Sequence, residues 1–312
     1  MNQSSVCRSA DEAVVAFEEL RPRLLGVAYG MLGSVAEAED AVQEAWIRLQ
    51  RTRLDDIDDL TGWLVTATSR IALDVLRSAR SRRETYVGPW LPEPVETSPD
   101  PADTVGFADA MSWAMLVVLE TLAPAERAAF VLHDVFGLPF TEVGSALGRN
   151  PSACRKLASR ARKHIEQRKP RFDVDPKEHR QTVDAFARAA VSGDLSGLLG
   201  VLAPGAVLTA DGGGIAAAAR RPIVGAERIA SFLAKTTTAE KGLSTQTTVV
   251  NGNPAVLVLK SDEVITVLTL NIHDGLIVTI DAVRNPNKFH GLRNRQKQTA
   301  ETTQGDPDDN AS

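Results

Sequence analysis

LPFTEVGSALGRNPSACRKLASRARKHIEQR, residues 138–168, predicts two helices joined by a tight turn. The first helix is expected over 140–147, and the glycine at Gly148 ends it. Asn150 is a suitable N-cap for the next helix, and Pro151 suits its first position. The pattern therefore predicts a second, longer helix that begins directly after a short turn.

The second helix, 151–167, separates its residues into two arcs when they are placed at about 100° per residue. One arc is apolar and is expected to pack on the preceding helices: Ala153, Cys154, Leu157, Ala158, Ala161 and Ile165. The other arc is polar and mostly basic: Ser152, Arg155, Lys156, Ser159, Arg160, Arg162 and Lys163. A helix-turn-helix presents such a strip to the major groove of DNA. Although a basic helix face is often only solvated, the glycine turn, the Asn-Pro start and the clean partition favour DNA binding.

Charge is segregated along the 312-residue chain, whose formal net charge is −5. Residues 141–171 contain nine Lys or Arg and two Glu, a local excess of seven positive charges. This segregation indicates one basic binding surface on an acidic chain. No apolar run is long enough to span a membrane and no signal peptide is evident, so we expect a cytoplasmic protein without a membrane partner. An acidic cluster lies elsewhere: Asp55, Asp56, Asp58 and Asp59.

Five blocks are expected from composition and hydrophobic periodicity. Residues 10–84 are helical, 85–110 form a proline-rich linker, and 111–169 are helical again. Residues 175–290 start with helices and continue with strand-like runs, in which Asn-Gly and Asp-Gly dipeptides predict two β-hairpins. The polar residues 291–312 are expected to be disordered. The fold class is therefore multidomain, with two all-α domains followed by an α+β domain.

The linker raises a question, since it contains Trp90 and Leu91 among five prolines at 89–101. Proline excludes a regular helix or a central strand there. Large apolar side chains in such a segment predict a partner surface against which they are buried.

The two helical blocks resemble the two-domain extracytoplasmic-function (ECF) sigma factors of bacterial RNA polymerase. The resemblance rests on AEAEDAVQEAWIRLQR (36–51), GWLVTATSRIALDVLRSARSRR (62–83) and the helix-turn-helix block. It implies a sigma domain 2 over 10–84 and a sigma domain 4 over 111–169. It also implies that the polymerase core and promoter DNA are partners, and that the helix 151–163 reads the −35 element.

Within domain 2 the resemblance implies two surfaces. The first would dock on the clamp helices of the polymerase β′ subunit and consists of Asp40, Gln43, Glu44, Trp46 and Arg48. The second would follow the non-template strand at the −10 element and consists of Arg70, Asp74, Arg77 and Arg80. The loop 52–62 is a candidate wall for a flipped base, although its acidic run is equally typical of a solvated loop.

Residues 175–290 resemble the SnoaL-like domain, of the NTF2-like fold, that is fused to one ECF subgroup. Three landmarks carry this resemblance: WLPEP at 90–94, DGGG at 211–214 and NPNK at 285–288. The subgroup usually has a lysine after DGGG, where this chain has Ile215. The resemblance implies a fused regulator of sigma activity, and we expect an interdomain contact formed by Trp90, Leu91, Pro92, Asp211, Gly212, Gly213, Asn285, Pro286 and Lys288.

The C-terminal domain offers weak signals for other functions. Some SnoaL relatives are enzymes, and Asp211, His273 and Asp281 are the acid–base candidates, but no motif supports catalysis, a cofactor or a metal site. We therefore expect no enzyme, and a small ligand in the domain's conical cavity remains open. A ligand-responsive helix-turn-helix regulator that acts without polymerase is the alternative function, but it has no use for the segment 36–51.

Overall fold

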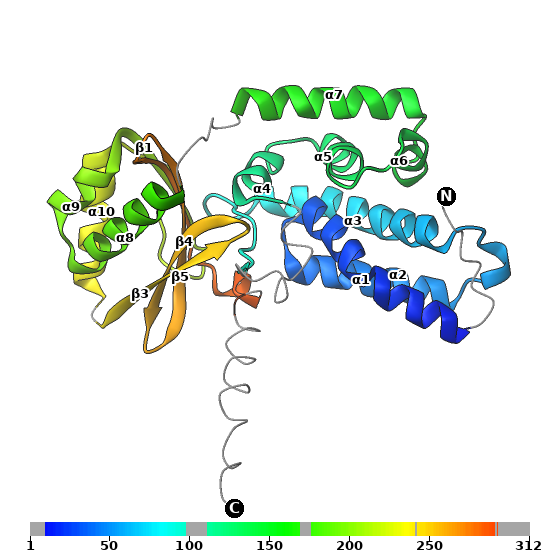
Figure 1. Ribbon diagram of the computed structural model, residues 1–312, viewed down its shortest axis with the longest axis horizontal. Helices are drawn as coiled ribbons and strands as arrows, with labels where there is room; N and C mark the ends of the chain where they lie inside the picture. The colour runs from blue at the N-terminus through cyan, green and yellow to red at the C-terminus, as the bar shows by residue number, and fades with distance from the viewer. Residues whose placement is uncertain (1–9, 98–110, 169–175, 241, 291, 293–312) are drawn as a thin grey trace, which may run out of the picture.

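The computed structural model describes residues 10–97, 111–168, 176–240, 242–290 and 292. A helical half and an α+β half lie side by side (Figure 1). In these described ranges no helix has the length and apolar character needed to cross a bilayer.

The first three long helices form an antiparallel bundle. They are α1 (Ala10–Leu32), α2 (Val35–Gln50) and α3 (Leu60–Glu84), with a short 3₁₀ turn, η1 (Leu54–Asp56), before α3. Ser34 caps α2 by accepting a hydrogen bond from the backbone N–H of Glu37. The apolar faces of α2 and α3 pack with α1 to form the core of this bundle.

The second helical block consists of α4 (Trp113–Leu119), α5 (Pro124–Phe130), α6 (Phe140–Leu147) and α7 (Pro151–Arg168), with a π-helical turn, η3 (Val131–Val135), after α5. Gly148 adopts a left-handed backbone at the end of α6. The Asn150 side chain accepts a hydrogen bond of 2.8 Å from the N–H of Ala153 at the start of α7. The predicted helix-turn-helix is therefore present with the expected caps.

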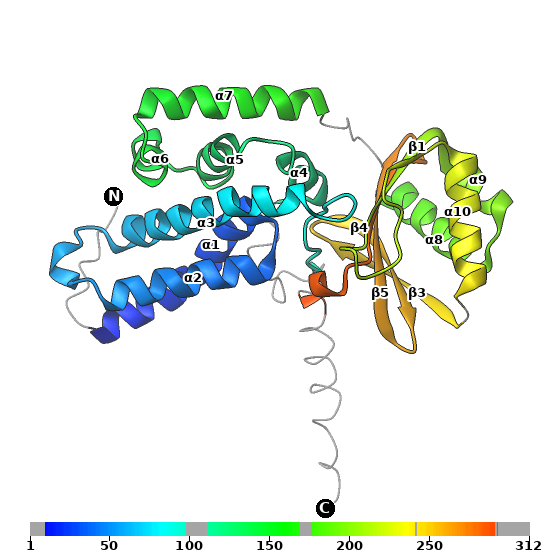
Figure 2. The ribbon, with the colours of Figure 1, turned by 180° about the vertical axis from the view of Figure 1, so that it is seen from behind.

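The two helical blocks share one hydrophobic core. α3 packs against α5 and α6, while α7 lies on the outer side of α5 and α6, away from α3 (Figure 2). Cys154 is buried on the apolar arc of α7, as its position at helical spacing predicted. Separation of the two blocks would expose apolar surface from both, which costs about 25 cal/mol per Å².

The C-terminal half is a six-stranded sheet with three helices on one face. The strands are β1 (Leu202–Asp211), β2 (Ile223–Val224), β3 (Leu243–Val250), β4 (Asn253–Lys260), β5 (Glu263–His273) and β6 (Leu276–Val283), in the order β2-β1-β6-β5-β4-β3. β1 and β6 are parallel, and the other neighbours are antiparallel. The helices are α8 (Pro176–Ser192), α9 (Leu195–Val201) and α10 (Ala226–Ala239), and a 3₁₀ turn, η4 (Pro286–Lys288), follows β6.

Both predicted hairpins are confirmed. Asn251 and Asp274 occupy the first turn position with φ values of 47° and 49°, followed by Gly252 and Gly275. Asparagine, aspartate and glycine tolerate this left-handed backbone better than other residues.

The second face of the sheet carries its own apolar cluster. Residues of β3–β6 form it together with Phe289 and Leu292, and two residues from outside the domain complete it: Leu91 of the linker and Trp113 of α4. Leu91 is 3% exposed and Trp113 is fully buried. The sheet is therefore apolar on both faces, and the sigma half of the chain covers the face that the helices leave open.

Candidate functional site

α7 lies on the outside of the helical half (Figure 1). Ser152, Arg155, Lys156, Ser159, Arg160, Arg162 and Lys163 are all exposed. Arg160 pairs with Glu126 at 2.7 Å and Arg162 pairs with Asp134 at 2.6 Å. These two arginines are therefore oriented by acidic residues of the preceding helices, while the rest of the arc is open to a ligand.

The predicted core-docking face of α2 is also exposed at Asp40, Gln43 and Arg48. Glu44 and Arg48 form an i,i+4 ion pair of 2.8 Å. Trp46 is half-buried, and its ring lies 4.6 Å from that of Phe17 on α1. The packing on Phe17 orients the Trp46 ring at the edge of the exposed face.

The predicted −10 surface on α3 is exposed at Arg70, Asp74 and Arg77, but Arg70 is engaged by a neighbouring helix. The Arg70 guanidinium donates two hydrogen bonds, of 3.2 and 2.7 Å, to the backbone carbonyl of Ser145 in α6. Asp74 and Arg77 form an exposed pair of 3.2 Å, and the Arg80 side chain lies outside the described residues. Arg70 thus contacts the helix-turn-helix, an interaction that the sequence did not predict.

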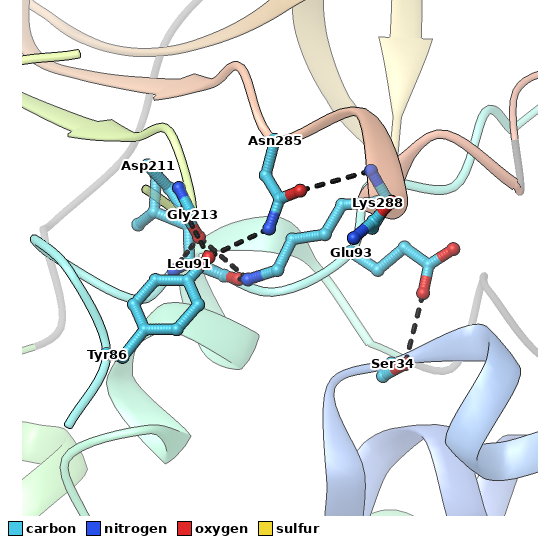
Figure 3. A network of polar contacts seen from close by, with 9 residues as sticks. Ser34, Tyr86, Leu91, Glu93, Asp211, Gly213, Asn285 and Lys288 are labelled. Carbon is cyan, nitrogen blue, oxygen red and sulfur yellow. Dashed lines mark hydrogen bonds and ion pairs between the residues drawn. The ribbon is translucent and has the colours of Figure 1, made fainter. Parts of the chain in front are cut away.

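The linker meets the C-terminal domain at Asp211, which is fully buried at the end of β1. Its carboxylate accepts hydrogen bonds from the Tyr86 hydroxyl at 2.6 Å, the Leu91 N–H at 2.9 Å and the Gly213 N–H at 3.1 Å. Lys288 Nζ forms an ion pair of 2.7 Å with the same carboxylate (Figure 3). Two chain segments 120 residues apart are therefore joined by one buried anion.

Lys288 binds the linker on two sides. Its Nζ donates a hydrogen bond to the Leu91 carbonyl and lies 3.2 Å from the centroid of the Trp90 ring. A cation in this position is attracted by the electron-rich ring face. Ile215 stands at the position where a lysine was expected, and it is 61% exposed. The cation of this buried network is therefore not at position 215 but is supplied by Lys288.

The glycines of DGGG allow a close backbone approach. Gly213 has φ of +62°, and a Cβ there would collide with the Asn285 side chain. Asn285 donates a hydrogen bond of 2.9 Å to the Tyr86 hydroxyl (Figure 3). A Cβ on Gly212 would collide with the Ala216 carbonyl. Pro286 opens the 3₁₀ turn that presents Lys288.

The other side of the linker binds the first helical bundle. Pro92 is buried, and Glu93 is 1% exposed. The Glu93 carboxylate accepts hydrogen bonds from the Val35 N–H at 2.8 Å and from the Ser34 hydroxyl at 3.2 Å. Because these donors belong to the N-terminus of α2, the linker carboxylate caps the predicted core-docking helix.

The β3–β4 hairpin tip joins all three parts of the chain through Asn251. Its Nδ2 donates to the Tyr29 hydroxyl of α1 at 3.0 Å, and its Oδ1 accepts from the Val95 N–H of the linker at 3.0 Å. Its backbone N–H donates to the Val95 carbonyl, and its carbonyl accepts from the N–H of Trp113 on α4. Asn251 is fully buried by these contacts.

A small cavity lies between the sheet and α8–α10, and its volume is about 70 Å³. Its wall is mainly apolar, with the Arg284–Glu240 ion pair of 2.9 Å among the lining residues. None of the acid–base candidates lines it: Asp211 binds the linker, His273 is half-exposed, and Asp281 lies on the opposite face and accepts from the Trp113 indole N–H at 2.9 Å. No group of three metal-ligating side chains is present in the described part of the chain.

Sequence reasoning found the WLPEP, DGGG and NPNK segments but missed Tyr29, Asn251 and Trp113. Asn251 was read only as a turn residue, and its contacts depend on how three domains pack. A tryptophan directly after the linker is the one signal that could have indicated Trp113.

Comparisons with known proteins agree with this arrangement. The Sigma-70 region 2 model matches residues 16–82, and the Sigma-70 region 4 model matches residues 112–165. SigJ, an ECF RNA polymerase sigma factor of Mycobacterium tuberculosis, is 39% identical over 94% of this chain and 98% of its own length. SigI of the same species, a probable ECF sigma factor, is 38% identical over 91% of this chain and 97% of its own.

The crystal structure of M. tuberculosis SigJ superposes on this chain with a TM-score of 0.70 and 35% identity. The match covers 89% of this chain and 98% of SigJ, so it includes the C-terminal domain. The fold class expected from the sequence is confirmed, and the alternative of a regulator that acts without polymerase is set aside. The chain belongs to the ECF family of RNA polymerase sigma factors, non-enzymatic proteins that direct the polymerase core to promoters and initiate transcription.

Proposed function

We propose that the structure is the resting form of this sigma factor and that its C-terminal domain stabilises that form. In the resting form the two domains that carry the surfaces for the −10 and −35 elements are packed together. Transcription requires domains 2 and 4 to separate on the polymerase. The fused domain therefore acts as an inhibitor that can be released.

One observation carries this proposal: Arg70 of the −10 surface contacts Ser145 of the helix-turn-helix at 2.7 Å. Elements centred about 25 base pairs apart are about 85 Å apart along B-form DNA. A sigma factor whose −10 helix packs against the first helix of its helix-turn-helix cannot place both domains on elements this far apart. The shared hydrophobic core of the two blocks stabilises the closed arrangement further.

The C-terminal domain stabilises closure because it contacts both sigma domains and the linker. Asn251 binds Tyr29 of domain 2, while Trp113 of domain 4 is buried on the sheet with Leu91. The described segment of the linker is held on the C-terminal domain at Asp211 and Lys288, and domain 4 is held there through Trp113, so both sigma domains stay on the same partner. Release of the linker from the C-terminal domain is therefore coupled to opening.

The open form would use the surfaces assigned above. The α2 face with Asp40, Gln43, Glu44, Trp46 and Arg48 docks on the β′ clamp helices, and the α7 arc reads the −35 element. Arg70 becomes available to the −10 strand when it leaves Ser145. Because the partner is the polymerase, the site of action is the cytoplasm.

A ligand in the cavity behind α8–α10 is not favoured. About 70 Å³ is half of the roughly 150 Å³ of an engineered cavity that binds benzene. Any ligand there would be very small, and it would not touch the sigma domains.

Run-off transcription with purified core polymerase tests the proposal. Asn251→Ala removes two interdomain hydrogen bonds without altering a proposed DNA or polymerase contact. At limiting sigma concentration this variant should give more transcript than the wild type. Asp274→Ala, at the same backbone position of the other hairpin and 85% exposed at its side chain, is the matched control. Equal or lower transcript from Asn251→Ala would contradict inhibition by the C-terminal domain.

A further inference from the structure

A second and larger cavity lies at the junction of the domains. Its volume is about 530 Å³, within the range of roughly 300–1,000 Å³ usual for small-molecule sites. We call it the interdomain cavity. Four parts of the chain line it: α3 through Leu76, the linker through Trp90 and Leu91, the α4–α5 region, and strands β1 and β6 through Thr209 and Asp281.

The charges at its wall do not cancel. Glu120 and Asp281 are carboxylates, and Arg127 is the cation among the described lining residues. Arg127 is committed to Glu120, with Nη1–Oε1 at 2.7 Å, and its Nε donates to the Gly30 carbonyl at 3.1 Å. The interdomain cavity therefore carries one uncompensated negative charge, on Asp281.

Asp281 is 3% exposed, and its carboxylate accepts a hydrogen bond from the Trp113 indole. No cationic side chain of the described residues pairs with it. Burial raises the pKa of Asp281 from 3.8 to about 6, while the Trp113 hydrogen bond opposes the rise. A buried carboxylate without a counter-ion is costly, and a cation placed beside it is correspondingly favoured.

The remaining wall selects the kind of cation. Much of it is apolar, formed by Leu76, Trp90, Leu91, Val117, Leu122 and Pro124. A metal ion such as Ca²⁺ needs about six to eight oxygen ligands, which this wall does not offer. An ammonium group on an apolar body matches both the carboxylate and the apolar surface.

We propose that the interdomain cavity binds a small organic ammonium compound, with Asp281 as its counter-ion. This proposal deepens the function proposed above, because the effect of the ligand on transcription rests on the resting form. The cavity exists only while domains 2 and 4, the linker and the sheet are packed together, so the ligand binds the closed form alone. Binding stabilises that form by mass action and lowers the concentration of sigma factor available to the polymerase.

Isothermal titration of the full-length chain with 2-phenylethylammonium chloride tests the site, at constant ionic strength and pH 7.5. The neutral analogue 2-phenylethanol has nearly the same shape without the charge. We expect saturable binding of the ammonium compound, and binding of the alcohol weaker by about tenfold or more, because a charge-assisted hydrogen bond is lost. Absence of ammonium binding, or equal binding of the alcohol, would overturn the proposal.

Two variants localise the binding. Asp281→Asn removes the charge but keeps an acceptor for Trp113, and it should weaken ammonium binding by about tenfold or more. Val117→Phe places a larger side chain at the wall of the interdomain cavity while Asp281 itself is unchanged, and it should also weaken binding. Asp274→Asn, on an exposed hairpin, is the control and should bind as the wild type does. Binding that survives both cavity variants would place the compound elsewhere and refute the site.

This titration contains no polymerase, so its outcome is independent of the transcription assay. If Asn251→Ala failed to raise transcription while the ammonium compound bound at Asp281, the resting-form proposal would fail and the site would stand. If binding failed while Asn251→Ala raised transcription, the ammonium site would be refuted and the resting-form proposal would stand.

Discussion

Substitution of Lys288 by methionine tests the linker contact directly. Lys288 and Asp211 are buried, with side chains 6% and 0% exposed, and their ion pair measures 2.7 Å. Removal of one partner from a buried pair costs about 3–5 kcal/mol, because the other charge stays buried without compensation. Asp211 retains three donors, from Tyr86, Leu91 and Gly213, so we expect the lower end, about 3 kcal/mol.

A loss of this size shifts the docking equilibrium of the C-terminal domain by about 100-fold. Fluorescent labels at positions 11 and 274, in a background with Cys7→Ser and Cys154→Ala, would report docking during a urea titration. Lys288→Met should release the energy-transfer signal at a lower urea concentration than the parent chain. The double variant Asp211→Asn/Lys288→Met should recover most of the loss, because no buried charge then remains unpaired.

Arg77→Met is the matched control for this experiment. It breaks a pair with Asp74 whose side chains are 51% and 75% exposed, and such pairs contribute about 0–1 kcal/mol. If Lys288→Met shifted the transition no more than Arg77→Met does, the Asp211–Lys288 pair would not stabilise the docked linker, and this account of the contact would be wrong.

Three further predictions concern single residues. Asn251→Ala should lower the free energy of unfolding by about 2–4 kcal/mol, since it leaves the Val95 N–H unpaired, removes one of the hydrogen bonds of the Tyr29 hydroxyl and places alanine at positive φ. Asp274→Ala should lose only the contribution of the positive φ, and urea denaturation of both variants measures the difference. For Asp281, the folded-state pKa of about 6 lies above the unfolded value of 3.8, so stability should fall as pH rises from about 4 to about 6, by about 3 kcal/mol for this group. Asp281→Asn should therefore exceed the wild type in thermal stability at pH 7.5 and match it near pH 4, and an unchanged difference across this range would contradict the assignment. Lys156→Ala on the exposed arc of α7 should weaken binding of the holoenzyme to the −35 element. It should also reduce the slope of log affinity against log salt concentration, measured by fluorescence anisotropy, by about one. An unchanged slope would mean that Lys156 does not contact a phosphate.

Local patterns predicted much of this fold. The Gly148 turn, the Asn150 cap and the burial of Cys154 follow from interactions within about ten residues, and so do the hairpins at Asn251 and Asp274. Propensity and periodicity act over that range, which explains why sequence alone was sufficient for these elements.

Contacts between distant segments were predictable only where a landmark marked both ends. Trp90 and Leu91 required a partner, and their apolar character indicated burial without naming the surface. The Arg70–Ser145 contact and the contacts of Asn251 depend on the packing of complete domains. Each joins residues at least 75 positions apart, and the polarity of these side chains does not mark them as partners. The acid–base candidates failed for a related reason: the face of the sheet to which a strand residue points depends on the register, which the sequence of one strand does not settle.

The distance between domains 2 and 4 tests the central claim most directly. Spin labels at positions 11 and 167, on α1 and the end of α7, would be measured by pulsed electron paramagnetic resonance in the free full-length chain and in the holoenzyme bound to promoter DNA. We expect one narrow distance distribution in the free chain and a clearly longer distance on the promoter, where the two elements are about 85 Å apart. The same distance in both states, or a broad distribution in the free chain, would contradict a closed resting form stabilised by the C-terminal domain.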